Sequence, residues 1–498
     1  MAPTSPDTVV AVDLGSNSFH AVVARVDGGG LTVVDRLRER VALAEGLGTD
    51  RRLAADVQER ALACLSRFGQ RLRGLPPASV RAVATNTLRR ARDARTFLTR
   101  AQEALGFPID VISGTEEARL IYLGVAHSRS DGSQSRLVVD IGGGSTEIVL
   151  GEGLDILESD SLQMGCVGWS SQFFAGGVVT RSAMRAAQLA ATRELVSLRR
   201  RYRRVGWQSC VGSSGTIVAT EEIVRLSGWS ERGLTRKALR SLRAALIDAG
   251  RIDKLGLPGL QDDRRPVFAG GVAILSAVFK ALDIDSMAAS PGALREGLLF
   301  DLLGRIRHED VRDPAIRRLA ERYHADLGQA LRVERTAHRL LGQIGSSWDL
   351  SEPGCARMLG WAARIHEIGL SIAHSGFHKH GAYIATHADL PGFSREDQEQ
   401  LALLVLAHRR KLSREAFDVL PAKVARSSLR LAVLLRLAVL LNRNRLDREL
   451  PKIQCRVTRG GLALGFPRKW LANHPLTQAD LEQEATLLAE AQIELALT

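Results

Sequence analysis

The sequence predicts an α/β protein in which two similar domains form a cleft and an almost entirely helical third follows. Two stretches, near residues 13 and 140, repeat one pattern of apolar strand, aspartate, small-residue turn and second apolar strand. Short apolar strands alternate with helical patterns up to about residue 305, and helical patterns dominate from 310 to 445. The expected domains are 1–125, 126–306, an all-α domain at 307–447 and a small α+β subdomain at 448–498.

Composition narrows the class of protein. The chain has 498 residues, of which 45% are hydrophobic and 25% charged, as in soluble globular proteins of several domains. The net charge of +13 indicates a polyanionic partner, which charge alone leaves open among nucleic acid, polyphosphate and an anionic membrane face. Five scattered cysteines without a CxxC pair favour a reduced, cytoplasmic compartment. No leader or spanning apolar run is expected, so any membrane contact is at most peripheral.

The stretch 137–151 is a predicted β-hairpin with a glycine tip. An apolar strand leads to Asp140, and a second apolar strand follows the tip. Consecutive glycines let backbone N–H groups approach a phosphate, and hydroxyls add donors; the tip consists of Gly142, Gly143, Gly144, Ser145 and Thr146. Asp140 and Glu147 place carboxylates beside the tip, where a divalent cation or a water can be held. A tight hairpin without a ligand is the alternative.

A matching hairpin lies at the N-terminus. The strand at 8–12 leads to Asp13, and its tip consists of Gly15, Ser16, Asn17 and Ser18. Two such hairpins suggest a duplicated domain, each half contributing a phosphate-binding tip to a shared cleft. Chance similarity of two short motifs is the alternative.

Two features between the hairpins carry chemistry. A helix beginning at Thr85 or Asn86 follows the strand at 80–84, and it places Arg89 where ligands of α/β sheets gather. Arg89 is a candidate phosphate contact, although an exposed arginine is the commoner case. Glu116 and Glu117 begin another helix, where two acids can simply complement the helix dipole. If burial raises its pKa, Glu117 could instead deprotonate a water that attacks phosphorus.

A third anion site is predicted after the strand at 208–211. The loop consists of Ser213, Ser214, Gly215 and Thr216, and a helix is expected from Ile217. It matches neither the Walker nor the GxGxxG pattern. A fourth small-residue loop is expected at 269–273, opening another helix.

Together these stretches resemble the exopolyphosphatase / guanosine pentaphosphate phosphohydrolase family of the actin–hexokinase–Hsp70-like superfamily. The motifs that carry the resemblance are AVDLGSNSFHAVVARV (11–26), ATNTLRRA (84–91), ISGTEEARLIYLGV (112–125), LVVDIGGGSTEIVLGE (137–152), GSSGTIVA (212–219) and SPGALREGLLFDLLGR (290–305). The stretch 366–384 resembles the helical, HD-related extension of the long, exopolyphosphatase-type members.

The resemblance implies two actin/ribonuclease-H-like domains and assigns roles within their cleft. Glu117 corresponds to the catalytic glutamate, and Asp140 and Glu147 would hold Mg²⁺ together with it; a monovalent cation such as K⁺ is a possible addition. The two hairpin tips, Arg89 and the loop 212–216 would bind phosphate. The implied reaction is in-line attack of a Glu117-activated water on a terminal phosphoanhydride.

The C-terminal third is basic and rich in histidine. Six of the 12 histidines lie between His366 and His408, but an HD metal site needs adjacent His and Asp, and this chain has His366-Glu367. A second metal-dependent active site is therefore disfavoured, and the histidines would bind phosphate or pack. Residues 409–449 hold 11 Lys and Arg against 4 Asp and Glu. Arg426 and Arg430 are expected to line a polyanion channel; side chains lying over an apolar core are the alternative.

The sequence therefore favours an exopolyphosphatase that releases orthophosphate from inorganic polyphosphate, acting as a homodimer without specific nucleic-acid binding. The first alternative is 5′-phosphate hydrolysis of guanosine pentaphosphate at the same site. An ATP-dependent kinase of the same fold is a further alternative, and a nucleic-acid-binding module would explain only the charge.

Overall fold

The computed structural model describes residues 8–27, 30–128, 135–290, 292–306, 310–446 and 450–498. The chain divides into two compact units, Met1–Asp310 and Val311–Thr498. Of the expected domain boundaries, those at 306/307 and 447/448 fall on residues outside the described ones. The boundary at 125/126 falls inside helix α4 (Gly114–His127), which packs between the two sheets of the first unit.

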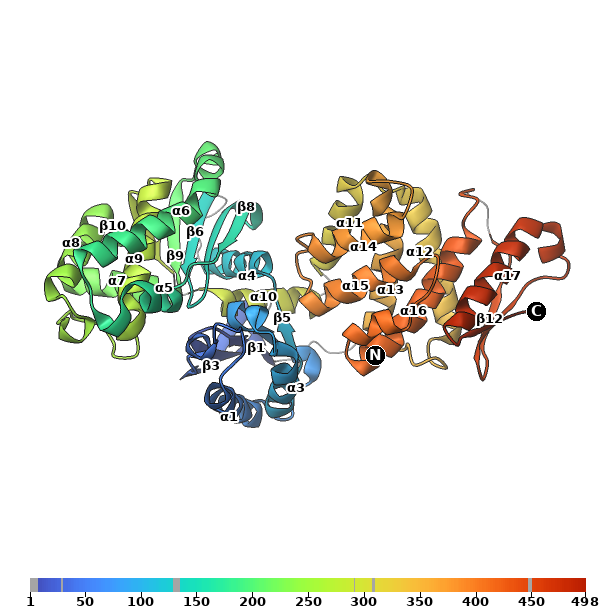
Figure 1. Ribbon diagram of the computed structural model, residues 1–498, viewed down its shortest axis with the longest axis horizontal. Coiled ribbons are helices and arrows are strands. Elements are labelled where there is room, and N and C mark those ends of the chain that lie inside the picture. Colours follow the sequence, from blue (N-terminus) through green and yellow to red (C-terminus); the bar gives the residue numbers. More distant parts are fainter. Residues whose placement is uncertain (1–7, 28–29, 129–134, 291, 307–309, 447–449) are drawn as a thin grey trace. The chain divides into compact units, whose positions relative to one another are not determined.

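The two sheets of the first unit repeat one topology (Figure 1). The first has the order β3-β2-β1-β4-β5 and the second β10-β11-β9-β6-β7-β8. In each, an antiparallel three-strand meander continues into two parallel strands, so β6, β7, β8, β9 and β11 correspond to β1 to β5. This correspondence agrees with the predicted duplication. The strands are β1 (Thr8–Leu14), β2 (Ser18–Asp27), β3 (Gly30–Arg40), β4 (Val80–Ala84), β5 (Ile109–Val111), β6 (Ser135–Ile141), β7 (Thr146–Glu152), β8 (Asp155–Leu162), β9 (Ser209–Ser213), β10 (Leu234–Thr235) and β11 (Ser286–Ala289).

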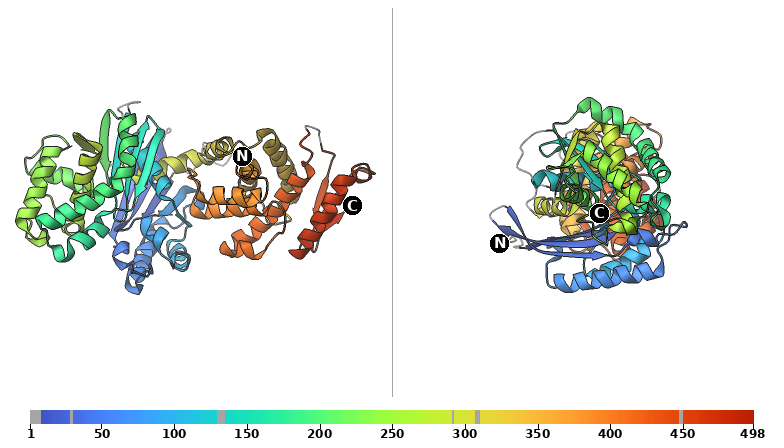
Figure 2. Two further views of the ribbon diagram at one scale, coloured as in Figure 1. Left: turned by 45° about the horizontal axis from the view of Figure 1, so that its top comes forward. Right: turned by 90° about the vertical axis from the view of Figure 1, so that its left-hand side faces the viewer.

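Strand alternation gives the first sheet two buried faces. Val10 and Val12 pack with helices α1 (Ala55–Leu72) and α3 (Ala94–Leu105), whereas Val9 and Ala11 point to the other face. The right-hand view in Figure 2 shows the blue strands with helical ribbon beneath them. The predicted helix near Thr85 is α2 (Asn86–Arg90), with Thr85 as its N-cap residue.

Helices α4 and α10 (Leu294–Ile306) pack between the two sheets. Two glycines let their backbones touch. A Cβ on Gly297 would lie 1.8 Å from the Leu120 carbonyl oxygen, and one on Gly124 would lie 2.1 Å from that of Ala293. The interface therefore requires glycine at both positions.

A buried ionic network also joins α4 and α10 to strand β4. The Asp301 carboxylate accepts hydrogen bonds from Arg81, Arg119 and Arg305, and Arg119 also pairs with Glu116. Glu116, the first acid of the predicted pair, is thereby a structural residue. Its neighbour Glu117 turns to the cavity described below.

The helices of the second half are α5 (Cys166–Phe173), α6 (Arg181–Val205), α7 (Ser214–Leu226), α8 (Arg236–Ala249) and α9 (Arg265–Leu282). The expected loop at 269–273 is wrong, because these residues lie inside α9. Its small residues permit close packing instead: a Cβ on Gly270 would lie 2.6 Å from the Ser170 amide nitrogen. Among the described residues α9 alone is long and apolar enough to cross a membrane, and 78% of it is buried in this core.

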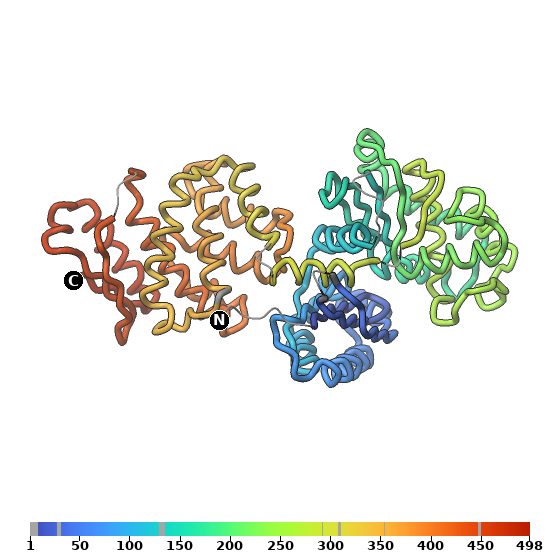
Figure 3. The backbone as a smooth tube through the Cα atoms, turned by 180° about the vertical axis from the view of Figure 1, so that it is seen from behind, coloured from blue at the N-terminus to red at the C-terminus, as the bar shows by residue number. Residues whose placement is uncertain are grey.

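The second unit begins with helices only, as predicted (Figure 3). They are α11 (Arg312–Arg322), α12 (Leu327–Ile344), α13 (Pro353–Ile365), α14 (Phe377–His387), α15 (Arg395–Ala407) and α16 (Ala422–Leu441). The predicted strands near 453–458 and 462–466 are β12 (Gln454–Val457) and β13 (Gly461–Gly465). They are followed by α17 (Pro475–Glu490) and an unpredicted strand, β14 (Glu494–Leu497). One apolar core runs from Ile316 to Ile493, so the terminal elements share it with the helices. The HD-like relationship stays a prediction.

Candidate active site

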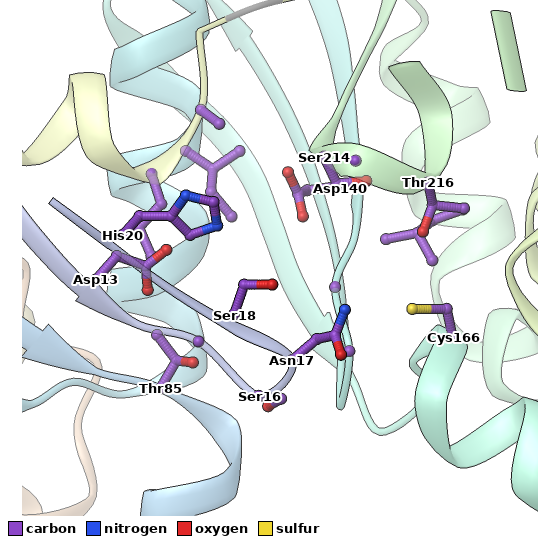
Figure 4. A pocket seen from close by; sticks show the side chains of 18 of the residues that line it. Asp13, Ser16, Asn17, Ser18, His20, Thr85, Asp140, Cys166, Ser214 and Thr216 are labelled. Carbon is purple, nitrogen blue, oxygen red and sulfur yellow. The ribbon is translucent and has the colours of Figure 1, made fainter. Parts of the chain in front are cut away.

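A cavity of about 380 Å³ in the first unit collects most of the predicted site residues. In Figure 4, Asp13 and His20 of the first sheet face Asp140 and Ser214 of the second half. The predicted residues that line the cavity are Asp13, Gly15, Ser16, Asn17, Ser18, Glu117, Asp140, Gly142, Gly143, Gly144, Ser145, Ser214, Gly215 and Thr216. The expected loop at 212–216 is wrong, because Ser214, Gly215 and Thr216 form the first turn of α7. This turn and the two hairpins thus meet at one place.

The second hairpin tip comes close to the first half of the unit because three of its residues are glycines. A Cβ on Gly144 would lie 2.5 Å from the Asn86 Oδ1 atom, and one on Gly143 would lie 2.9 Å from the Ser16 Cβ atom. The glycines of the second tip therefore permit contact with the first half of the unit. This packing role stands beside the predicted phosphate role.

Four predicted residues do not line the cavity. Thr146 is fully buried, and its hydroxyl donates to the Met164 carbonyl oxygen at 2.6 Å. The Ser213 hydroxyl donates to Asp140 Oδ2 and so positions that carboxylate. Glu147 is buried and accepts a hydrogen bond from Ser161 at 2.8 Å. The fourth is Arg89.

Arg89 contacts Glu117 rather than the cavity. Its Nη1 donates to Glu117 Oε2 at 3.1 Å and to the Ile112 carbonyl oxygen at 2.8 Å. Both side chains are mostly buried, with 16% and 10% of their surfaces exposed. Arg89 is therefore placed to orient the predicted base.

Burial raises the pKa of four carboxyl groups at this site, those of Asp13, Glu117, Asp140 and Glu147. Burial, opposed by the Arg295 charge and helped by the charges of Glu117 and Asp140, raises the pKa of Asp13 to about 7. Burial raises the pKa of Asp140 to about 6. The pKa of Glu147 lies well above its ordinary value because of burial and the charges of Glu117 and Asp140. Burial also raises the pKa of Glu117, and the Arg89 charge opposes that rise. A glutamate with a raised pKa suits general-base chemistry near neutral pH.

The sequence-based prediction missed one histidine and three arginines of the cavity. His20, Arg38, Arg264 and Arg295 line it. Arg295 Nη1 lies 2.7 Å from His20 Nδ1, and burial and the nearby arginines lower the pKa of His20 to about 2. The imidazole is therefore neutral and accepts from Arg295.

Gly215 makes room for one of these arginines. A Cβ there would lie 2.0 Å from Arg264 Nη2. His20 and Arg295 lie inside the motifs at 11–26 and 290–305, so their polar side chains beside the predicted site were a signal. Arg38 and Arg264 stand outside every motif, so only folding brings them to the cavity.

Unpartnered polar atoms indicate that the cavity accommodates a polar ligand. Within the described residues, Asp13 Oδ1, Asn17 Oδ1, Ser18 Oγ and Ser214 Oγ are buried without a hydrogen-bond partner. Such atoms are costly unless a ligand or water satisfies them. Hydroxyls suit phosphate oxygens, and carboxylate or amide oxygens suit a cation or its bound waters.

The donor set fits magnesium only with help from a substrate. No group of three or more His, Cys, Asp or Glu side chains is placed to hold a metal ion in the part of the chain that the structure describes. Mg²⁺ usually uses one or two carboxylates plus phosphate oxygens and waters. Asp140 and Asp13 line the cavity and fit that mode, whereas Glu147 does not line it.

Of the two arginines predicted to line a channel in the second unit, Arg430 has hydrogen-bond partners within the protein. Arg430 Nη1 donates to the Trp348 carbonyl oxygen and to Asp349 Oδ2, both at 2.8 Å, and its guanidinium lies 5.8 Å from the centre of the Trp348 ring. For Arg430 this packing agrees with the alternative prediction, in which the side chain lies over an apolar core rather than lining a polyanion channel. Arg426 is exposed. The channel itself stays a prediction.

Comparisons with known proteins agree with this geometry. Residues 22–306 match the Ppx/GppA phosphatase family, and residues 311–485 match domain III of the Ppx/GppA phosphatases. The guanosine-5′-triphosphate,3′-diphosphate pyrophosphatase of Photobacterium profundum is 39% identical over 97% of this chain and 96% of its own length. A solved PPX-GPPA enzyme of Aquifex aeolicus is 27% identical, with a TM-score of 0.50, over 59% of this chain and 98% of its own. An exopolyphosphatase from Cytophaga hutchinsonii, 21% identical with a TM-score of 0.55 over 60% of this chain and 98% of its own, shares the fold.

Proposed function

The chain belongs to the Ppx/GppA phosphatase family and is a phosphoanhydride hydrolase, and we propose that it removes the 5′-terminal phosphate of guanosine pentaphosphate. The observation that carries this choice is the similarity to a guanosine-5′-triphosphate,3′-diphosphate pyrophosphatase along almost the whole length of both chains. This ranks the guanosine pentaphosphate activity, the alternative in the sequence-based expectation, above polyphosphate hydrolysis.

The charge of the cavity supports a substrate with two phosphate groups. The buried carboxyl groups Asp13, Glu117 and Asp140 line the same cavity as Arg38, Arg264 and Arg295. Carboxylates serve a water and a cation, whereas guanidinium groups bind phosphate oxygens in pairs. A nucleotide with a 5′-triphosphate and a 3′-diphosphate has two phosphate chains. The 5′ chain would undergo the reaction, and the 3′ chain would bind the arginines.

In the proposed mechanism Glu117 accepts a proton from a water as that water attacks the terminal phosphorus in line with the bridging oxygen. The phosphoanhydride bond breaks, orthophosphate leaves, and the electron pair stays on the new terminal oxygen of the nucleotide. Arg89 orients Glu117 through their 3.1 Å contact. The Ser18 and Ser214 hydroxyls can donate to the phosphoryl oxygens. When bound by Asp140 and Asp13, magnesium would neutralise charge on the phosphate chain.

The test is a direct comparison of substrates. Phosphate release by the purified protein is measured with guanosine pentaphosphate and, separately, with long-chain polyphosphate, at equal magnesium. We expect the higher kcat/KM for guanosine pentaphosphate. The Glu117→Gln variant should lose about 10²- to 10⁴-fold in kcat on either substrate, the usual worth of a general base. Near-wild-type turnover by this variant in a folded protein would remove Glu117 from its role.

Polyphosphate is the second candidate. The net charge of +13 favours a long polyanion, and so do the exposed Arg426 and the basic stretch around it. A higher kcat/KM on polyphosphate would make exopolyphosphatase the function. In that case Arg426→Ala should weaken the binding of long polyphosphate chains more than that of short ones.

Assembly and location complete the proposal. A location in the cytoplasm would agree with five cysteines that are all free and buried, and a homodimer is part of the proposal. Sedimentation of the purified protein tests the dimer.

A further inference from the structure

The second unit contains a basic cavity of about 440 Å³ that the proposed reaction does not use. It lies among α14, the end of α15, α16 and α17. Its charged and histidine lining consists of Glu367, His374, His408, Arg409, Arg410, Arg436, Arg443, Arg445, Asp480 and Glu484. Five arginines thus stand against three acids.

Each acid of this cavity already has an arginine partner. The three ion pairs are Arg436 with Glu484, Arg443 with Asp480 and Arg445 with Glu367. Within the described residues Arg409 and Arg410 form no ion pair, and Arg409 instead lies 4.4 Å from the centre of the Phe377 ring. Two positive charges therefore remain for a ligand.

The side chain of Arg436 holds the backbone that carries Arg409 and Arg410. Arg436 is 1% exposed, and its guanidinium donates to the carbonyl oxygens of Ala407 at 2.5 Å and Arg410 at 2.6 Å. Arg410 itself has a φ of 65°, a strained value for a residue with a side chain. A buried arginine that fixes a strained turn preorganises Arg409 and Arg410 before any ligand arrives.

His408 supplies an observation that is independent of charge. Its side chain is buried, at 2% exposure, and lines the cavity. Its Nδ1 lies 2.6 Å from the Val405 carbonyl oxygen, which can only accept, so Nδ1 carries the proton. Its Nε2 has no partner among the described residues. Burial and the neighbouring His366 lower the pKa of His408, so Nε2 is a bare acceptor that needs a donor.

We propose that this cavity is a second, non-catalytic site that binds hydrogen phosphate, either free or as a protonated terminal phosphate group. Arg409 and Arg410 donate to its oxygens, and His408 Nε2 accepts from its P–OH. The two unpaired arginines match the charge of −2 of free hydrogen phosphate, HPO₄²⁻, which still has one P–OH. A terminal phosphate group that keeps its P–OH carries a charge of −1, because the second proton of a phosphate monoester leaves with a pKa near 6. The proposal concerns binding alone and does not depend on the substrate of the first unit.

Hydrogen exchange of the full-length protein with and without inorganic phosphate tests this site, because it reports where protection occurs. We expect phosphate-dependent protection in peptides that cover 405–412 and 436–446. The double variant Arg409→Gln, Arg410→Gln should raise the phosphate concentration that gives half-maximal protection at least tenfold. The matched control Arg317→Gln, Arg318→Gln makes the same charge change at exposed positions of α11 and should leave it unchanged.

Three further ligands separate the possible outcomes. Sulfate has the same charge but no O–H, so it should protect at least tenfold less well than phosphate; equal protection would overturn the role of His408. Methyl phosphate distinguishes a site for free phosphate from one that admits a phosphate monoester. Protection by Zn²⁺ alone with none by phosphate, or phosphate protection that survives in the double variant, would overturn the proposal.

Discussion

Replacing Arg89 with glutamine should move the acidic limb of the pH–rate profile to higher pH. In the proposed mechanism the deprotonated form of Glu117 accepts the proton of the water, so the rate should rise as pH passes the pKa of that group. Burial raises this pKa, and Arg89 lowers it through its charge and a 3.1 Å hydrogen bond. A hydrogen bond to a charged group stabilises by about 1.5–3 kcal/mol, and about 1.4 kcal/mol corresponds to one pKa unit. The limb should therefore move up by about one to two pH units.

The assay is phosphate release across pH 5–9, fitted as kcat/KM, for wild type, Arg89→Gln and Arg89→Lys. Lysine keeps the positive charge without the planar guanidinium, so its limb should lie between the other two. Circular dichroism at each pH checks that the variants are folded. An Arg89→Gln limb at or below the wild-type pH would refute the assignment of Glu117 as the titrating base.

Three further predictions concern stability. Burial raises the pKa of Asp13 from 3.8 to about 7, so its contribution to stability is present below pH 3.8 and is lost as pH rises through 7. Asp13→Asn should therefore raise the melting temperature relative to wild type more at pH 8 than at pH 5, and an equal difference at both would contradict this. Asp301→Asn should cost about 3–5 kcal/mol in urea unfolding, because it removes the buried negative charge that pairs with Arg81, Arg119 and Arg305. Breaking the exposed pair by Arg100→Gln should cost less than about 1 kcal/mol. Gly297→Ala should lower the melting temperature, since its Cβ would lie 1.8 Å from a carbonyl oxygen of α4.

Much of the fold and site follows from local sequence. Strands end at Asp13 and Asp140, and small residues follow both, because apolar alternation and glycine turns are local rules. The repeat of that pattern predicts two sheets of one topology, which the structure has. The place of Glu117 in the first turn of a helix was predicted correctly, whereas its role as the base came from the resemblance to the family and stays a prediction. Where local patterns were ambiguous the prediction was wrong: Gly270 suggested a loop, yet it lies within α9 because small side chains also suit close helix packing.

Only the tertiary structure decided which polar groups share a cavity. Arg38 and Arg264 are far from any motif, and Arg89 turns to Glu117 rather than to the cavity. The raised pKa values of Asp13 and Asp140 come from burial by distant segments. The tertiary structure likewise places the half-buried Arg409 and the exposed Arg410 at one cavity with the buried His408. Electrostatic environment depends on what surrounds a group in space, whereas strand and turn patterns depend on neighbours in the chain. The role of Glu117 as the base stays a prediction, whereas the sequence by itself determined the two hairpins and folding determined which charges surround them.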